Sequence, residues 1–446
     1  MQGVSKNIFY SFFVQIPNYI LGIAAGIYMT RQLGPEGKGI YTLFIANMQL
    51  LVMFLGMNLS GGLQYFVSSG KIMASKLWSI SLASLVIVTI ICAGLLFLPL
   101  PFDEIFFEKG YSSLFYRGWL LISFFLAVLN SVFIGFLQGK KKFAYINLVS
   151  LINAIINFFV FTSLFYLAQN RYLFVGIREV LLFTLGILFI NSGLYFILFK
   201  NNIKSIKIVK FSLKEDVGTL SHFLIPSYIS ILINFFNYRF IIWIINYYHS
   251  SEQLGYFSLA LGFSQMTLMV TMSLNIVMFS HFSSQKDVNI AIKDFIIAFK
   301  VNLYIIVFIT GFLVMISSWV IPLFYGSIFT PSVIPFNILA LGTIFLSQAQ
   351  VFGHFFGAMN KNWTNSMAYI TVLTLLIIMS FLVVPDYGII GGAWVNTISY
   401  FILCAIFFYL IFKKYKVSIK SLLIINKEDI IRFKNLIIKD RANRHK

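Results

Sequence analysis

Arg31-Gln32-Leu33-Gly34-Pro35-Glu36-Gly37-Lys38-Gly39 joins two long apolar stretches, so residues 8–66 form a predicted hydrophobic hairpin. Two short pieces of this hairpin return later in the chain, in the same order. Ile16-Pro17-Asn18-Tyr19-Ile20 recurs as Ile225-Pro226-Ser227-Tyr228-Ile229, and Gly39-Ile40-Tyr41-Thr42-Leu43 recurs as Gly255-Tyr256-Phe257-Ser258-Leu259. A repeat found twice in matching context predicts two similar halves that face each other.

The composition is that of a polytopic membrane protein. Hydrophobic residues make up 59% of the chain and charged residues 11%, whereas soluble domains carry about 25% charged residues. Apolar runs of roughly 20 residues recur along the chain, and at 1.5 Å per residue each crosses a hydrocarbon core of about 30 Å. We predict twelve transmembrane helices: 8–30, 40–68, 78–99, 118–138, 146–168, 174–199, 219–247, 255–282, 297–321, 335–356, 367–384 and 393–412.

The distribution of positive charge predicts the orientation. With these spans, 26 of the 33 Lys and Arg residues fall on one side, and the other seven lie on the opposite face or inside spans. The basic side is expected to be the cytoplasm, so both termini are predicted to be cytoplasmic. The net charge of +19 is then a topology signal and a source of attraction to anionic membrane lipid, not a sign of nucleic-acid binding.

The polar segments predict the domain boundaries. Residues 200–218 form the longest internal polar stretch, and they are the natural cytoplasmic linker between a first half (1–199) and a second half (219–412). Residues 413–446 form a basic cytoplasmic tail in which basic and aliphatic residues alternate. The alternation is typical of an amphipathic helix on the inner leaflet; a solvated tail is the alternative.

The sequence contains no pattern typical of an enzyme. Cys92 and Cys404 lie in separate spans, and the five histidines lack the spacing of paired metal ligands. No glycine-rich loop followed by Lys-Ser or Lys-Thr is present, so no phosphate-binding motor is indicated. We therefore expect no catalytic residue, no metal site and no cofactor.

Ionisable groups inside the membrane are costly, so they are the first candidates for function. Arg239 lies about 12 Å below the outer end of its span at helical rise. Arg178 and Glu179 lie a turn or two inside the outer end of theirs, where Glu179 is a candidate coupling group or ion-pair partner. Arg31 marks the outer end of the first span and is either a substrate ligand or an interfacial anchor.

Two prolines inside predicted spans indicate kinked helices that line a cavity. Pro17 should kink the first helix and free a carbonyl that Gln15 or Asn18 could satisfy. In the second half, Pro226 is followed by Ser230 and Asn234 in the same arrangement. A kink that serves packing alone is the alternative.

The sign of the buried charges narrows the substrate class. Apart from Glu179, the spans contain no clear intramembrane carboxylate, so a cavity among them would be cationic. Exporters of organic cations usually need a buried acid, whereas arginine binds phosphate or pyrophosphate in a bidentate manner. Aromatic residues are 18% of the chain, and their faces could stack on sugar rings.

Two segments carry a resemblance to a known family. The stretch from Thr30 to Leu43 resembles the Arg-x-Leu-Gly-Pro-x-x-x-Gly-x-Tyr signature of Wzx-type polysaccharide flippases, which belong to the multidrug/oligosaccharidyl-lipid/polysaccharide (MOP) exporter superfamily. Asn237-Tyr238-Arg239, followed by residues 254–260, is similar to the signature that opens the second half of these proteins. Relatives often have an acidic residue two positions after this arginine, where this chain has Ile241.

The resemblance implies a fold and a function. The fold is an all-α membrane protein with two six-helix bundles, a pseudo-twofold repeat and a central cavity that opens alternately to each side. The function is to flip an undecaprenyl-phosphate- or pyrophosphate-linked oligosaccharide across the cytoplasmic membrane for O-antigen, capsule or exopolysaccharide assembly. Arg31, Arg178 and Arg239 would bind the headgroup.

The implied partners are the lipid-linked glycan and membrane lipid, with a proton or sodium counter-ion and glycan polymerase or assembly proteins as further candidates. A monomer is expected. Two other functions stay open: a cation-coupled multidrug exporter of the same fold, and a membrane-embedded glycan polymerase or ligase.

Overall fold

The computed structural model describes residues 2–98, 106–108, 110–170, 172, 174–202, 207–272, 274–275, 282, 287–359 and 361–424. Side chains are described for these residues except 2–15, 202, 213, 223, 226, 227 and 362. Throughout the described part the regular structure is helical, with no strand, so the all-α prediction is confirmed. The chain forms two compact units, Gly3–Gly255 and Tyr256–Lys446.

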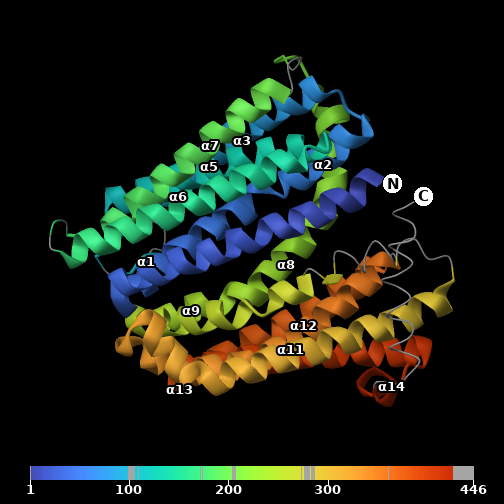
Figure 1. The fold of residues 1–446 in the computed structure, drawn as a ribbon. Helices are drawn as coiled ribbons and strands as arrows, with labels where there is room; N and C mark the ends of the chain where they lie inside the picture. The colour runs from blue at the N-terminus through green and yellow to red at the C-terminus, as the bar shows by residue number, and fades with distance from the viewer. Residues whose placement is uncertain are drawn as a thin grey trace. The chain divides into compact units, whose positions relative to one another are not determined.

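The first unit is built from long helices (Figure 1). They are α1 (Gln2–Gly56), α2 (Leu59–Ser69), α3 (Ala74–Phe97), α5 (Leu114–Gly139), α6 (Phe143–Gln169), α7 (Ile177–Asn202), the π-helical turn η1 (Leu213–Val217), α8 (Gly218–Tyr248) and the start of α9 (Ser251–Gln265). The second unit contains the rest of α9, α11 (Val288–Tyr325), the 3-10 helix η2 (Ser327–Ser332), α12 (Val333–Ala358), α13 (Asn362–Tyr415) and α14 (Ile419–Leu423).

Nine helices in the described ranges are long and apolar enough to cross a membrane. Helix α13 contains two of the predicted spans, and α1 contains the first span and most of the second; each has a backbone break between its two spans. The predicted span 255–282 includes residues outside the described part, and α9 covers only its first portion. The chain is therefore a multi-pass membrane protein, while the count of twelve spans stays a prediction.

The break in α1 falls at Gly34, which has φ 67° and ψ −178°. Glycine adopts positive φ without a Cβ clash, and the following Pro35 has a fixed φ suited to the first turn of a helix. The sequence predicted a nine-residue connection, but the helix resumes at once after Gly34. In α13 the equivalent break is at Gly388, three residues after Pro385.

The torsion angles of α1 depart from helical values at Gly34 and stay helical through Pro17, where a kink was predicted. A second interruption divides the predicted span 40–68. Met57 and Asn58 both have positive φ, and α2 begins directly after them. The predicted span 40–68 did not include this interruption, although Asn58 is a residue type that adopts positive φ readily.

The helices of the first unit enclose an aromatic core. Helix α5 packs against α2, α3 and α7, and α6 packs against α7 (Figure 1). Trp78 stacks on Phe199 with ring centroids 4.6 Å apart, and Phe44 meets Trp119 edge to face at 5.8 Å. Close helix contact needs small residues, and an added Cβ at Gly135 would lie 2.8 Å from the Ser60 carbonyl of α2.

The basic turns of this unit meet at one end. Gly139, which precedes Lys140, packs directly on Val67 near the end of α2. The segment that follows α7 binds α3 at the same end, since the backbone N–H of Val209 donates to Ser79 Oγ at 2.9 Å. At the opposite end, Gln32 Nε2 of α1 donates to the Val175 carbonyl before α7 at 3.1 Å.

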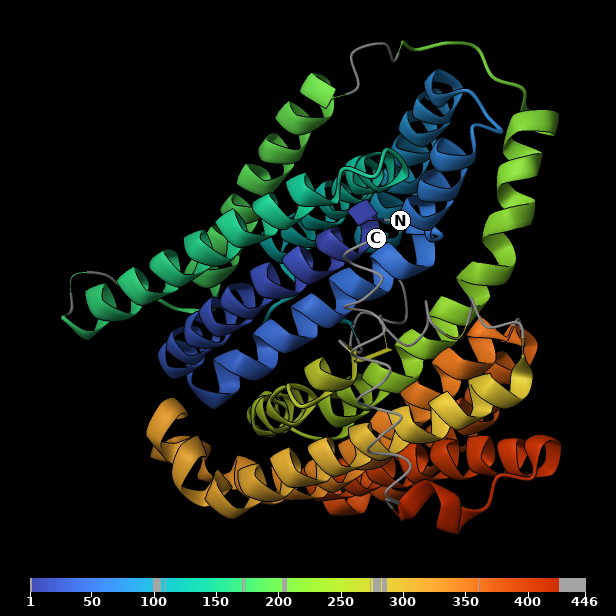
Figure 2. The ribbon, with the colours of Figure 1, turned by 45° about the vertical axis from the view of Figure 1, so that its right-hand side comes forward.

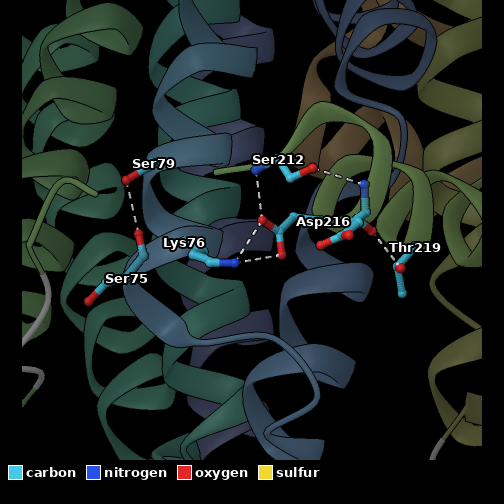
Figure 3. A network of polar contacts seen from close by, with 7 residues as sticks. Ser75, Lys76, Ser79, Ser212, Asp216 and Thr219 are labelled. Carbon is cyan, nitrogen blue, oxygen red and sulfur yellow. Dashed lines mark hydrogen bonds and ion pairs between the residues drawn. The ribbon is translucent and has the colours of Figure 1, made fainter. Parts of the chain in front are cut away.

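The predicted linker is fixed to α3 by an ion pair (Figure 3). Lys76 Nζ lies 3.0 and 3.2 Å from the two carboxylate oxygens of Asp216. Asp216 Oδ2 also accepts a hydrogen bond from the Ser212 backbone N–H at 2.8 Å. The Ser212 N–H and the Lys76 ammonium hold the pKa of Asp216 below its usual value.

The compact units do not divide the chain at this linker. Helix α8 was predicted to be the first helix of the second half. It belongs instead to the first unit, which extends to Gly255 in α9. Leu224 of α8 packs on Gly62 of α2, and Trp243 donates from Nε1 to Asn47 Oδ1 of α1 at 2.7 Å. The predicted boundaries at 199, 218 and 412 stay predictions.

The second unit is a helical bundle with a phenylalanine core. Helix α12 packs on both α11 and α13, and the helices of this unit form one bundle (Figure 2). Phe295, Phe352, Phe355 and Phe407 are fully buried in this core, where the Phe295 and Phe355 ring centroids are 4.7 Å apart. The predicted basic tail starts near the end of α13, and its residues 425–446 lie outside the described part.

Candidate functional site

The two arms of α1 and the second half of α8 bring two basic side chains together. Lys38 lies one turn after the break at Gly34, and Arg239 lies on α8; both side chains are half-buried. Their positive charges repel each other across this helix pair. The Lys38 ammonium also lies 5.7 Å from the centre of the Tyr41 ring, a cation–π contact one turn along the same helix.

Local packing holds these two helices in register. Asn47 is fully buried; its Oδ1 accepts from Trp243 Nε1 at 2.7 Å and its Nδ2 donates to the Phe106 carbonyl at 2.5 Å. Ile241, the position at which an acidic residue is expected from the resemblance, is buried at 2% exposure. Helix α8 contains no Asp or Glu.

A reciprocal glycine contact joins the two copies of the repeated motif. A Cβ added at Gly39 would lie 1.8 Å from the Ser251 carbonyl oxygen, and one added at Gly255 would lie 1.9 Å from the Pro35 carbonyl oxygen. Each glycine thus meets the residue four positions before the other. This is the small-xxx-small packing by which membrane helices bring their backbones together.

The predicted residues Arg178 and Glu179 have separate roles. Arg178 is exposed, with its guanidinium 4.8 Å from the centre of the Phe115 ring on α5. Glu179 Oε2 accepts a hydrogen bond from the Gly176 backbone N–H at 2.9 Å, as the third residue of a helix does in a capping box. Among the described residues these two side chains form no ion pair with each other.

Arg31 is exposed at the end of the first arm of α1. The shared role of Arg31, Arg178 and Arg239 in binding a headgroup stays a prediction. Lys38 is a further basic residue, and its charge lies within reach of Arg239. Lys38 is one of the seven basic residues that lie outside the predicted cytoplasmic side. Its position in the Arg31–Gly39 connection was the sequence feature that marked it as a candidate.

The predicted hinge residues make local hydrogen bonds. Asn18 Nδ2 donates to Ser150 Oγ of α6 at 3.0 Å, so its amide bridges two helices and does not cap its own helix. Asn234 Nδ2 donates to the Ser230 carbonyl of α8 at 2.9 Å. The side chains of Gln15 and Pro226 lie outside the described residues.

A second polar cluster, not predicted, lies inside the second unit. Asn302 of α11 accepts from Thr271 Oγ1 at 2.9 Å and donates from Nδ2 to Ser347 Oγ of α12 at 3.3 Å. Asn302 and Ser347 are fully buried. An asparagine within a long apolar run was the signal that sequence reasoning missed, since polar side chains in a bundle core bind neighbouring helices.

The described residues contain no group of three or more His, Cys, Asp or Glu side chains placed to hold a metal ion. Cys92 and Cys404 are free thiols in different units. Lys38 and Arg239 offer positively charged hydrogen-bond donors. Such donors bind carboxylate or phosphate oxygens.

Comparisons with solved structures identify the fold. The lipid II flippase MurJ in an inward closed conformation superposes with a TM-score of 0.74 and 19% identity, covering 97% of this chain and 93% of that chain. An inward-facing multidrug resistance MATE family transporter of the MOP superfamily gives 0.71 and 15% identity, over 88% and 93%. A MOP superfamily transporter from Pyrococcus furiosus gives 0.57 and 16% identity, over 93% and 96%.

A comparison with curated protein sequences finds no match. A family model does match: the model described as polysaccharide biosynthesis protein aligns with residues 4–285. The matched region contains the connection Arg31–Gly39, Arg239 and the contact between Gly39 and Gly255. With more than half of its length matched and the fold of MOP transporters, this chain belongs to the polysaccharide biosynthesis protein family.

Proposed function

We propose that this protein flips a lipid-linked oligosaccharide from the inner to the outer leaflet of the cytoplasmic membrane, for surface polysaccharide assembly. The supporting observation is the pair of half-buried basic side chains, Lys38 and Arg239, on neighbouring membrane helices. Two like charges at this depth repel each other, and a bound anion relieves the repulsion. A phosphate or pyrophosphate between glycan and lipid is such an anion.

The family and the fold support the same proposal. Family membership links the chain to polysaccharide biosynthesis, and a protein of similar fold is a flippase for lipid II. In the proposed substrate the anchor is an undecaprenyl chain, and Arg31 and Arg178 assist at the outer end. Lys38 and Arg239 bind the headgroup.

The membrane potential gives this transport a direction. With the cytoplasm negative, outward movement of an anion is favoured by about 2.3 kcal/mol per charge per 100 mV. An uncompensated phosphate is thus driven outward without an energy-coupling domain. A proton or sodium counter-ion would add to this driving force.

The test measures flipping in proteoliposomes that contain a fluorescent polyprenyl-diphosphate oligosaccharide. Arg239→Ala and Lys38→Gln should each lower the flipping rate at subsaturating substrate about tenfold or more, because a charge-assisted hydrogen bond contributes roughly 1.5–3 kcal/mol. Arg239→Lys should retain partial activity. The matched control is Lys142→Gln, since Lys142 lies 5.7 Å from the Tyr145 ring in the same Lys-x-x-Tyr spacing as Lys38 and Tyr41.

Normal flipping by Arg239→Ala and Lys38→Gln at wild-type protein levels would remove the basic pair from the mechanism. Export of a cationic dye by the wild type, with no flipping of the lipid-linked sugar, would instead support the multidrug exporter. An increase in glycan chain length in the vesicles would support a polymerase or ligase.

A further inference from the structure

The second unit carries a basic cluster where α13 begins and ends. Lys361 precedes α13, and its Nζ donates to the Tyr415 hydroxyl at 2.8 Å and lies 5.1 Å from the centre of that ring. Lys414 lies 5.9 Å from the same ring centre. Because α13 reverses at Gly388, residues 361 and 414 lie at the same end of the unit although 53 positions separate them in the sequence.

The ammonium groups of Lys361 and Lys414 lie close enough for their positive charges to repel each other. Among the described residues, neither Lys361 nor Lys414 forms an ion pair with a carboxylate. Two cations fixed on one tyrosine ring are an arrangement that an anion stabilises.

The cluster stands on a rigid base. Tyr415 packs against Phe355 of the core, with ring centroids 6.0 Å apart. The chain then turns at Lys416, which has φ 55°, and Val417 and Leu422 return into the same core with 5% and 2% exposure. The Tyr304 hydroxyl of α11 donates to the Leu423 carbonyl at 2.6 Å and so fastens α14 beside the cluster.

The surroundings of the cluster are typical of a membrane interface. Trp363, two residues after Lys361, is 72% exposed, and Phe412, Ile419 and Leu423 are exposed as well. Exposed apolar side chains beside lysines are the pattern of segments that lie at the headgroup level of a bilayer. The anion expected at this place is a lipid headgroup, because the exposed apolar side chains around the lysines would contact the acyl chains of the same lipid.

We propose that Lys361, Lys414 and Tyr415 form a binding site for the phosphate headgroup of an acidic phospholipid. The phosphate oxygens accept hydrogen bonds from both ammonium groups, while Trp363 and Ile419 contact the acyl chains. The site is separate from Lys38 and Arg239 and does not depend on the proposed transport function. It holds the C-terminal end of α13 against the inner leaflet.

The experiment measures phosphatidylglycerol bound to the full-length protein by native mass spectrometry after titration in detergent. Lys361→Gln with Lys414→Gln should lower the affinity about 30-fold, because each basic side chain near an anionic lipid contributes a factor of about five. The matched control is Lys71→Gln. Lys71 donates to the Tyr65 hydroxyl at 2.7 Å and lies 5.1 Å from its ring, the same geometry with a single lysine.

A second variant guards against misfolding. Lys361→Arg with Lys414→Arg keeps both charges and should keep most of the affinity, with a thermal midpoint equal to that of the glutamine pair in lipid-free detergent. The proposal is overturned by equal affinity in the glutamine pair and the wild type, or by an equal loss in Lys71→Gln. It is also overturned if inorganic phosphate competes at the lipid's own concentration, since the ligand would then be free phosphate.

Discussion

At the scale of single residues, this chain separates charges that stabilise the fold from charges that cost stability. Asp216 and Lys76 form an ion pair at the end of the first unit, and Glu179 caps the start of α7. Lys38 and Arg239 instead repel each other inside a helix pair. Charged groups inside a membrane are costly, so this pair is a candidate for function.

Removal of one charge from the basic pair should therefore stabilise the substrate-free protein. Lys38→Gln is expected to raise the Tm in detergent by about 1–3 °C, since it removes the repulsion from Arg239. The same variant should lose affinity for a polyprenyl-diphosphate oligosaccharide. Differential scanning fluorimetry of Lys38→Gln and of the surface control Lys142→Gln measures the effect; a lower Tm for Lys38→Gln alone would show that Lys38 stabilises the fold.

The ion pair of Asp216 predicts that protection of the linker stays constant as the pH falls from 7 to 5. The folded-state pKa of Asp216 lies below its usual value because the Ser212 N–H and Lys76 stabilise the carboxylate. Its contribution is present above the unfolded pKa of about 3.9 and is lost as the pH falls through the lower folded pKa. Hydrogen exchange of residues 207–217 should thus show equal protection of the linker between pH 7 and pH 5.

Asp216→Asn should remove that protection at pH 7. The neighbouring surface variant Glu215→Gln, which keeps the Lys76 pair, is the control. Protection in Asp216→Asn equal to that in the wild type would show that the hydrogen bonds donated by the Lys207 and Val209 N–H groups to Ser75 and Ser79 hold the segment without the ion pair.

At the scale of elements, glycine decides where helices break and where they touch. Gly34 and Gly388 take positive φ and each divide a long apolar helix. Gly39 and Gly255 have ordinary torsions and serve instead to bring two backbones together. The sequence favours Gly34 as a break because Pro35 follows it, but it does not show which glycines bring two backbones together.

Gly39→Ala should disrupt the contact between α1 and α9. The new Cβ would overlap the Ser251 carbonyl oxygen, and backbone cannot move aside as a side chain can. Overpacking of this kind costs about 1–3 kcal/mol, so we expect a lower Tm and a lower yield of folded protein. Gly26→Ala is the control on the same helix, because a Cβ there meets nothing within 4 Å. Equal Tm values for the two variants would contradict the contact.

At the scale of the whole molecule, charge and hydropathy set the topology. In the first unit the basic turns gather at one end, and the break of α1 and the start of α7 lie at the other. This arrangement fits the predicted orientation, in which the lysine-rich end faces the cytoplasm. The first residues of the two repeated motifs, Gly39 and Gly255, meet within this unit.

Cysteine labelling in intact cells tests this orientation. Tyr172 lies in the connection between α6 and α7, and Lys141 lies between α5 and α6; both are exposed. In a chain with Cys92 and Cys404 replaced by alanine, Tyr172→Cys should react with a membrane-impermeant maleimide. Lys141→Cys should react only after the membrane is permeabilised. The reverse pattern would invert the topology and place both termini outside.

The sequence by itself determined the helical membrane class, the family resemblance and the turn at Gly34, because hydropathy and local backbone preferences act over short distances along the chain. It also identified Arg239 as a costly charge in an apolar helix. The tertiary structure alone decided which charges meet. It placed the charge of Lys38 within reach of Arg239, and it joined Lys361 and Lys414 on the ring of Tyr415. These contacts join residues far apart in the sequence, and their partners depend on packing that no local sequence pattern specifies.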